Sequence, residues 1–366
     1  MGSGIRCMLM RGGTSKGAYF LAEDLPADPE ERDDLLLRIM GSPDERQIDG
    51  IGGAHPLTSK VAIVSRSTLT DCDVDFLFAQ VGITQAVVDT TPNCGNILAG
   101  VGPFAIERGL VRASDPQTRV RVRTLNTGTL AELVVSTPDG TVCYAGDEAI
   151  DGVPGTSAGM PIHFIDTAGS VCGSLLPTGN LTDRIGDIDV TCIDNGMPVV
   201  LLRASDFGFT GDETCAQIEA NKQSLARIEA LRLEAGKMMG LGDVTNAVVP
   251  KMSLLAAPRR GGCVNTRTLI PRKCHTSIGV FGAVSVATGC VLPGTIAHSL
   301  AVIPAGKTKL LDVEHPTGRF CVRMEVGGTE EAPTVVRSGL VRTARALFDG
   351  VVFPRGKQVV HESVTG

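Results

Sequence analysis

Alternating and clustered apolar positions along the chain predict more strands than helices. Alternation predicts a strand over residues 119–124, and short apolar runs predict strands over 61–64, 74–78, 199–202, 253–256 and 320–326. A turn at Pro138-Asp139-Gly140 is expected to join a strand at 130–135 to one at 141–144. The 44 glycines and 20 prolines agree with a sheet-rich fold that has many tight turns.

Two segments have the spacing of amphipathic helices. Asp28 as N-cap, Pro29 at the first position and Glu31 in a capping box predict a helix that ends at Gly41. Apolar residues that recur every three or four positions predict a longer helix over 212–239.

Two other segments, residues 94–108 and 276–289, are apolar or small on every helical face. Such helices must be surrounded by other elements. When the two segments are aligned without gaps, Cys94 matches Cys274 and Gly102 matches Gly282. We therefore predict an α+β fold of two similar halves, each a curved sheet or barrel around a central helix.

The predicted domains are residues 1–185, to which the tail 345–366 can return, and residues 186–344. The polar, turn-rich stretch at 177–189 is the predicted boundary.

Composition excludes several classes of protein. A net charge of −6, no Trp and two Tyr argue against nucleic acid or an anionic membrane as partner. The longest apolar run, 278–292, is shorter than a membrane span. The 11 cysteines form no CxxC motif, which argues against a zinc ribbon and predicts no metal site. Scattered cysteines without a secretory segment at the start predict reduced thiols in a cytoplasmic protein.

The glycine-rich stretch at residues 10–17 lacks the spacing of a Walker phosphate loop, so nucleotide binding is rejected. Its backbone N–H groups and the Thr14 and Ser15 hydroxyls could instead receive a carboxylate. The alternative interpretation is a glycine turn that leads into a strand.

Cys94 lies where the first buried helix is expected to begin. The unpaired N–H groups of Gly95 and Asn96 and the helix dipole favour a thiolate there and favour a bound anion. The alternative is a small core residue, since buried cysteines are common. Cys274 takes the matching place in the second half of the alignment.

Lys60 follows Ser59 and starts a Val-Ala-Ile-Val run, an unusual place for a hydrated ammonium group. Burial favours the neutral amine, which can act as a general base. The alternative is a lysine at a strand end whose amine reaches water.

Cationic residues precede the second buried helix. They are Arg259, Arg260, Arg267, Arg272 and Lys273. Arginine suits carboxylates, although most of these side chains are expected to be solvated. His275, Thr276 and Ser277 would form a second anion cradle at the helix start, unless His275 merely caps the helix.

At these residues the chain resembles a family of cofactor-independent isomerases, typified by 2-methylaconitate cis-trans isomerase, that share the diaminopimelate epimerase fold. The resemblance is carried by residues 10–17, 58–60, 93–96, 101–105 and 250–252. The runs at 49–53 and 275–283 are most similar to the 4-oxalomesaconate tautomerases or isomerases of gallate and protocatechuate breakdown.

The resemblance implies two pseudo-symmetric halves with a cleft between them, a lysine and a cysteine flanking the substrate, and no metal or organic cofactor. Lys60 and Cys94 match those two positions. Relatives that epimerise amino acids use two cysteines, whereas His275-Thr276-Ser277 here favours a lysine/cysteine isomerase. The residues expected to bind substrate are Arg11, Gly13, Thr14, Ser15, Ser59, Asn93, Gly95, Asn96, Arg267, His275, Thr276, Ser277, Ile278 and Gly279.

The expected substrate is a small unsaturated tricarboxylate, 4-oxalomesaconate. Lys60 would remove a carbon-bound proton, and Cys94 would return one elsewhere or assist. Keto–enol tautomerisation and a 1,3-allylic shift both remain open. Alternative functions are a 2-methylaconitate or aconitate isomerase and a non-catalytic carboxylate binder, and a homodimer is possible.

Overall fold

The computed structural model describes residues 4–329 and 332–356. The chain divides into two compact units: residues 1–162 together with 342–366, and residues 163–341. The boundary therefore differs from the one predicted at residue 185. The stretch at 177–189 is part of unit 2, where Asp183 accepts hydrogen bonds from Thr178 and Asn180. Its polar residues thus satisfy one another within a folded turn.

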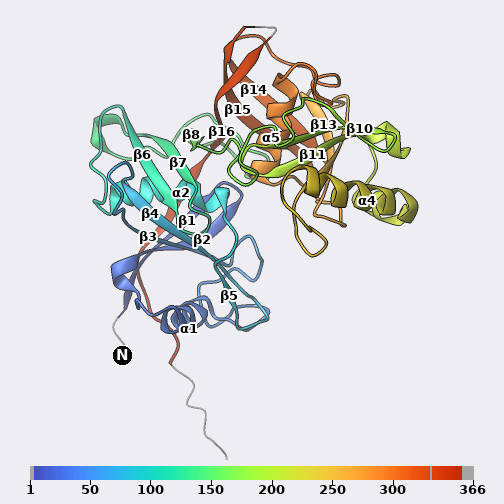
Figure 1. Ribbon diagram of the computed structural model, residues 1–366. Helices are drawn as coiled ribbons and strands as arrows, with labels where there is room; N and C mark the ends of the chain where they lie inside the picture. Colours follow the sequence, from blue (N-terminus) through green and yellow to red (C-terminus); the bar gives the residue numbers. More distant parts are fainter. Residues whose placement is uncertain (1–3, 330–331, 357–366) are drawn as a thin grey trace, which may run out of the picture. The chain divides into compact units, whose positions relative to one another are not determined.

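In unit 1 the helices α1 (Pro29–Met40) and α2 (Gly95–Glu107) accompany a sheet (Figure 1). The strands are β1 (Ile5–Gly12), β2 (Ser15–Leu21), β3 (Lys60–Arg66), β4 (Val74–Val81), β5 (Val88–Asp89), β6 (Gln117–Thr124), β7 (Leu130–Ser136) and β17 (Ala344–Val352). Short 3-10 turns lie at Ala22–Asp24 and Pro138–Gly140.

The order of strands in unit 1 brings the end of the described chain beside its beginning. β17 pairs antiparallel with β1, β1 with β2, β3 with β4 and β6 with β7, whereas β2–β3 and β4–β6 are parallel. The red β17 accordingly runs beside the blue β1 (Figure 1). This strand lies in the predicted tail, whose residues 357–366 fall outside the described part.

Unit 2 has its own sheet and helices. The strands are β9 (Asp183–Ile185), β10 (Ile188–Asp194), β11 (Pro198–Arg203), β12 (Lys251–Ala256), β13 (Val264–Leu269), β14 (Thr308–His315) and β15 (Gly318–Gly328). The helices are α3 (Cys215–Ala220), α4 (Lys222–Met238) and α5 (Val280–Val291), with a 3-10 turn at Ala204–Phe207. β8 (Met160–Ile165) and β16 (Pro333–Arg342) carry the chain across the boundary.

Unit 2 repeats the connectivity of unit 1. β10–β11, β12–β13 and β14–β15 are antiparallel, and β11–β12 and β13–β14 are parallel. In each unit, one helical segment joins the first parallel pair, and one apolar helix, α2 or α5, joins the second. The prediction of an α+β fold with two similar halves, each built around a central helix, is therefore confirmed.

The two faces of each sheet carry different helices. Val61 and Ile63 of β3 pack in a core with Leu36 and Ile39 of α1. Met252 and Leu254 of β12 pack in a core with α3 and α4. Because side chains alternate along a strand, the intervening residues point to the faces of α2 and α5.

Helix boundaries follow local chemistry. Asp28 caps α1 by accepting from the N–H groups of Glu30 and Glu31, and Gly41 ends the helix with a φ of 80°. The helix predicted at 212–239 is two helices, because Asn221 caps α4 at its junction with α3. Residues 141–144 form no strand, so the predicted hairpin is wrong, and β7 pairs with β6 instead.

The structural correspondence between α2 and α5 differs from the one that the gap-free alignment predicted. Cys94 is the N-cap of α2, whereas Gly279 is the N-cap of α5, so the predicted start at residue 276 is wrong. Asn96 lies against the β1–β2 turn at Gly13, and Phe281 lies against Gly196 in the β10–β11 turn. Cys94 therefore corresponds to Gly279 rather than to Cys274.

Candidate functional site

The glycine-rich stretch makes room for the first turn of α2. A Cβ on Gly12 would lie 2.3 Å from the Asn96 carbonyl oxygen, and one on Gly13 would lie 2.2 Å from Asn96 Oδ1. A Cβ on Gly17 would lie 3.1 Å from Ile97 Cδ1. Gly13 also has a φ of +51°, which favours glycine. These contacts explain the glycines by close packing between the hairpin and the helix.

Two predicted anion donors in this stretch have partners within unit 1. The Gly13 N–H donates to the Thr343 carbonyl at 2.8 Å. Arg11 donates to Thr343, to the Gly13 carbonyl and to Ser157 Oγ. Arg11 therefore ties the hairpin to the segment that leads into β17, and we do not place it among the substrate contacts.

The two hydroxyls of the turn differ. Thr14 Oγ1 accepts from Asn96 Nδ2 at 3.0 Å. Ser15 is 2% exposed, and its Oγ has no hydrogen-bond partner among the described residues. Strand alternation puts Ser15 on the same face as Gly17, toward α2. An unsatisfied buried hydroxyl is costly, so this one is suited to a ligand that completes its hydrogen bonding.

Lys60 lies on the α2 face of the sheet. It is the first residue of β3, pairs with Gly17 of β2 and Gln80 of β4, and is 8% exposed. Its Nζ donates to Gln80 Oε1 at 2.6 Å and lies 4.9 Å from the centre of the Phe78 ring. Gln80 Nε2 donates to the Ser59 and Pro56 carbonyls, which fixes the amide oxygen toward the lysine.

Ser59 supports the loop before β3. Its Oγ donates to the Val81 carbonyl at 2.9 Å and accepts from Gln47 Nε2 at 2.8 Å, and the residue is fully buried. The run at 49–53 continues this packing, since Gly52 leaves no space for a Cβ beside Gln47. We therefore remove Ser59 from the predicted substrate contacts and assign it a structural role.

Cys94 is half-buried at the start of α2, and its side chain makes no capping hydrogen bond. Tyr19, on the same sheet face as Gly17, donates to the Ile97 carbonyl at 2.6 Å. Burial raises the pKa of Tyr19, and the neighbouring Cys94 thiol adds to the effect. The start of α2, with Cys94, Gly95 and Asn96, thus lies over the face of β2 that carries Ser15. Lys60 lies on the same face of the neighbouring strand β3.

Asn93 precedes this thiol. Its Nδ2 donates to the Thr124 and Thr127 hydroxyls, and its Oδ1 is buried without a partner in the part of the chain described. Unit 1 therefore presents two unsatisfied oxygens, one amine and one thiol around the start of one helix.

In unit 2 the predicted site residues divide between two faces. Arg267 pairs with Leu254, whose side chain packs toward α4, and its Nε donates to the Glu213 carbonyl at 2.6 Å. Its Nη1 donates to Asn265 Oδ1 and the Thr266 carbonyl. Arg267 therefore points away from the α5 face, and we withdraw it from the predicted substrate contacts.

The segment from His275 to Gly279 leads into α5 without helical structure. The His275 N–H donates to the Thr268 carbonyl, and the Ser277 N–H donates to His275 Nδ1 at 2.9 Å. The Thr276 carbonyl accepts from Thr317 Oγ1. Ser277 Oγ lies 3.3 Å from His315 Nε2, Ile278 is buried, and Gly279 borders open space. His275 therefore orders this segment and does not cap the helix.

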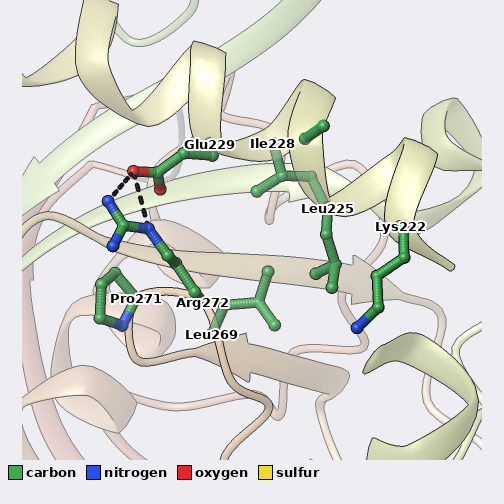
Figure 2. Close-up of a pocket in the computed structure, with 8 residues that line it drawn as sticks. Lys222, Leu225, Ile228, Glu229, Leu269, Pro271 and Arg272 are labelled. Atoms are coloured by element: carbon green, nitrogen blue, oxygen red, sulfur yellow. Dashed lines mark hydrogen bonds and ion pairs between the residues drawn. The ribbon is translucent and has the colours of Figure 1, made fainter. Parts of the chain in front are cut away.

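Two other cations near the segment, Arg272 and Arg259, are paired. Figure 2 shows a pocket beside α4 in which Arg272 binds Glu229, at 2.9 Å from Nη2 to Oε1. Arg259 pairs with Asp212. The residues that line the pocket are Lys222, Leu225, Ala226, Ile228, Glu229, Leu269, Pro271 and Arg272. They lie on the α4 side of β13, so the pocket is separate from the α5 face.

Sequence reasoning missed the likeness between Lys251 and Lys60. Both are the first residues of strands that pair in parallel with the preceding strand of their unit. Each lysine is followed by an apolar residue that packs in the core on the sheet face opposite the central helix. Val61 packs there with α1, and Met252 packs there with α3 and α4. The shared pattern, a lysine at the start of an apolar run, was visible in the sequence.

Among the described residues, no group of three or more His, Cys, Asp or Glu side chains is suited to a metal ion. Nor is any helix in that part of the chain long and apolar enough to cross a membrane.

Known proteins resemble this chain along nearly its whole length. A "(4E)-oxalomesaconate Delta-isomerase" from a Novosphingobium strain is 58% identical over 95% of this chain and 96% of its own. A "4-oxalomesaconate tautomerase" from Pseudomonas putida is 59% identical over 95% of each chain. The crystal structure of a methylitaconate-delta-isomerase, 38% identical, has a TM-score of 0.84 and covers 95% of each chain. The family model described as PrpF protein matches residues 3–355, and the chain belongs to the PrpF protein family.

Proposed function

We propose that this protein is a cofactor-independent isomerase that moves a proton on 4-oxalomesaconate, with Lys60 as base and Cys94 as the second acid–base group. The observation that carries the proposal is the buried Lys60 amine on the sheet face that also receives the first turn of α2. The named activities of the relatives at 58% and 59% identity support the choice of substrate.

The chemistry needs only proton transfer. A proton on carbon next to a conjugated carbonyl and alkene is acidic, because the electron pair left by C–H cleavage spreads into a dienolate. Lys60 Nζ, as the neutral amine, takes this proton and becomes an ammonium. Protonation of the dienolate at another atom, by the Cys94 thiol or by the Lys60 ammonium, completes the isomerisation without an oxidant or reductant.

Carboxylates and the developing negative charge need donors. The N–H groups at the start of α2 and the unpartnered Ser15 hydroxyl are suited to this, since a helix N-terminus favours anions. Thr14, Asn93, Gly95 and Asn96 remain the proposed substrate contacts around them. In unit 2, His275, Thr276, Ser277, Ile278 and Gly279 are retained as proposed contacts.

Proton NMR in heavy water tests the proposal. The protein should catalyse deuterium entry into 4-oxalomesaconate together with appearance of its isomer, and Lys60→Met should slow both by about 10²–10⁴-fold. The same spectra with 2-methylaconitate test the alternative isomerase. Calorimetric binding of the acids without deuterium entry would overturn the enzyme assignment in favour of a carboxylate binder.

A cytoplasmic location is also proposed. All 11 cysteines are free thiols in the structure, which suits a reducing compartment.

A further inference from the structure

Lys251 is a half-buried cation without a partner. It begins β12, and no hydrogen bond or ion pair is formed by its Nζ among the residues that the structure describes. A lysine in such a position normally reaches water or meets a carboxylate. The side chain therefore has donor capacity that the protein itself leaves unused.

Strand register puts His275 on the same face as Lys251. Met252, Leu269 and Cys274 lie side by side in one row and all point into the core with α3 and α4. The residues next to them in each strand, including Lys251 and His275, consequently point to the opposite face.

The protonation of His275 is set by its neighbour. Its Nδ1 accepts the Ser277 N–H, so the neutral ring carries its hydrogen on Nε2 and can donate it to an anion. Burial lowers the pKa of His275, and the charge of Lys251 lowers it further. Burial and then Arg232 lower the pKa of Lys251.

Arg232 does not supply the missing partner. It is fully buried and donates to Glu229 and to the Val244, Ala247 and Val249 carbonyls. Its carboxylate partner Glu229 is thus committed to Arg232 and Arg272. Glu229 is therefore engaged elsewhere, and Lys251 forms no ion pair within residues 4–329 and 332–356.

We propose that Lys251 and His275 form a carboxylate-binding site in unit 2, with Lys251 Nζ and His275 Nε2–H as its donors. The ligand class is a small di- or tricarboxylate, a choice that rests on the proposed function. Lys251 is the counterpart of Lys60, but here the N-cap of the central helix is Gly279, so no thiol takes the place that Cys94 has in unit 1.

Histidine NMR of the full-length protein, titrated with citrate as an unreactive tricarboxylate, tests this site. The His275 ring signal is assigned by its loss in His275→Gln. In the wild-type protein citrate should shift this signal at millimolar concentration or below. In Lys251→Met the midpoint of the titration should rise at least tenfold, whereas Lys251→Arg, which keeps the charge, should stay within about threefold.

Lys222→Met is the matched control, since Lys222 lies on α4 beside the pocket of Figure 2 and its loss should leave the midpoint unchanged. A His275 signal that ignores citrate up to about 20 mM, or an equal midpoint in Lys251→Met, would overturn the proposal. Turnover of 4-oxalomesaconate is measured separately. Loss of the isomerase assignment would appear as absent turnover, whereas loss of this site would appear as a His275 signal that does not respond to citrate.

Discussion

The two units share a plan of strands and helices but differ in the chemistry around the central helix. Each has a lysine at the start of the strand after its first helical segment, Lys60 or Lys251. Only unit 1 has a thiol at the N-cap of the central helix, Cys94, where unit 2 has Gly279. A repeated backbone therefore preserves the places for functional groups, whereas the groups themselves are free to diverge.

The lysines also differ in their partners. Gln80 holds Lys60 from the adjacent strand at 2.6 Å, which fixes the position of the amine. Lys251 has no such acceptor among the described residues. A fixed amine suits proton transfer at one atom, whereas an amine without a partner suits the binding of a carboxylate.

The largest expected effect comes from removing the amine in one unit and then in the other. Lys60→Met should lower kcat by about 10²–10⁴-fold while the protein still folds, because positioned acid–base catalysis supplies that factor. Lys251→Met should keep more than about a tenth of the wild-type kcat at saturating substrate. Steady-state kinetics and circular dichroism check both, and an equal loss of kcat in the two variants would break the comparison.

Replacing the thiol tests the difference at the N-cap. Cys94→Ser should lower turnover by about tenfold or more, because serine is a much weaker acid than cysteine. Deuterium exchange at the carbon that Lys60 deprotonates should persist. If product formation and exchange both stay at wild-type rates, Cys94 has no part in the reaction.

Adding a methyl group to a glycine in the β1–β2 turn or the β10–β11 turn tests whether packing there supports stability alone or activity as well. Gly12→Ala places a methyl group 2.3 Å from the Asn96 carbonyl, and Gly196→Ala places one 2.5 Å from the Phe281 ring. Each should lower the free energy of unfolding by about 1–3 kcal/mol, measured by urea denaturation. Gly12→Ala should also lower kcat, because it displaces the start of α2.

Gly279→Ala serves as the control for these turns, since a Cβ there meets nothing within 4 Å. Because glycine is favoured over alanine at an N-cap, the free energy of unfolding of Gly279→Ala should fall by less than about 1 kcal/mol, a smaller loss than in Gly12→Ala. If Gly12→Ala has wild-type stability, the close contact between the β1–β2 hairpin and α2 is not needed for folding, and the prediction is wrong.

The smallest expected effect comes from the acceptor that holds Lys60. Gln80→Met removes the amide oxygen that accepts from Lys60 Nζ at 2.6 Å, so the amine is held less firmly in position. Steady-state kinetics should show kcat lowered by about threefold. An unchanged kcat would separate Gln80 from the base.

The sequence predicted what local patterns determine. The caps of α1 at Asp28 and Gly41, the strands around Lys60 and the central helix after Cys94 follow from residue chemistry within one element. The split at Asn221 and the late start of α5 were missed, because a polar residue or an N-cap glycine is a weak boundary marker in one sequence.

Contacts between distant segments could not be predicted in this way. Nothing local to Arg11 or Gly13 indicates that Thr343 accepts their hydrogen bonds. The face of Arg267 depends on the register of β13 with β12, and the role of Ser59 depends on Gln47 and Val81. Such roles emerge only when the strands are paired in space.

The pairing of β17 with β1 has a consequence for biosynthesis. During synthesis β1 has to wait for its partner strand Ala344–Val352, which emerges only after the whole of unit 2 has been synthesised. Until then one edge of β1 is open to other chains, so the nascent polypeptide is expected to need protection from aggregation longer than its second half does.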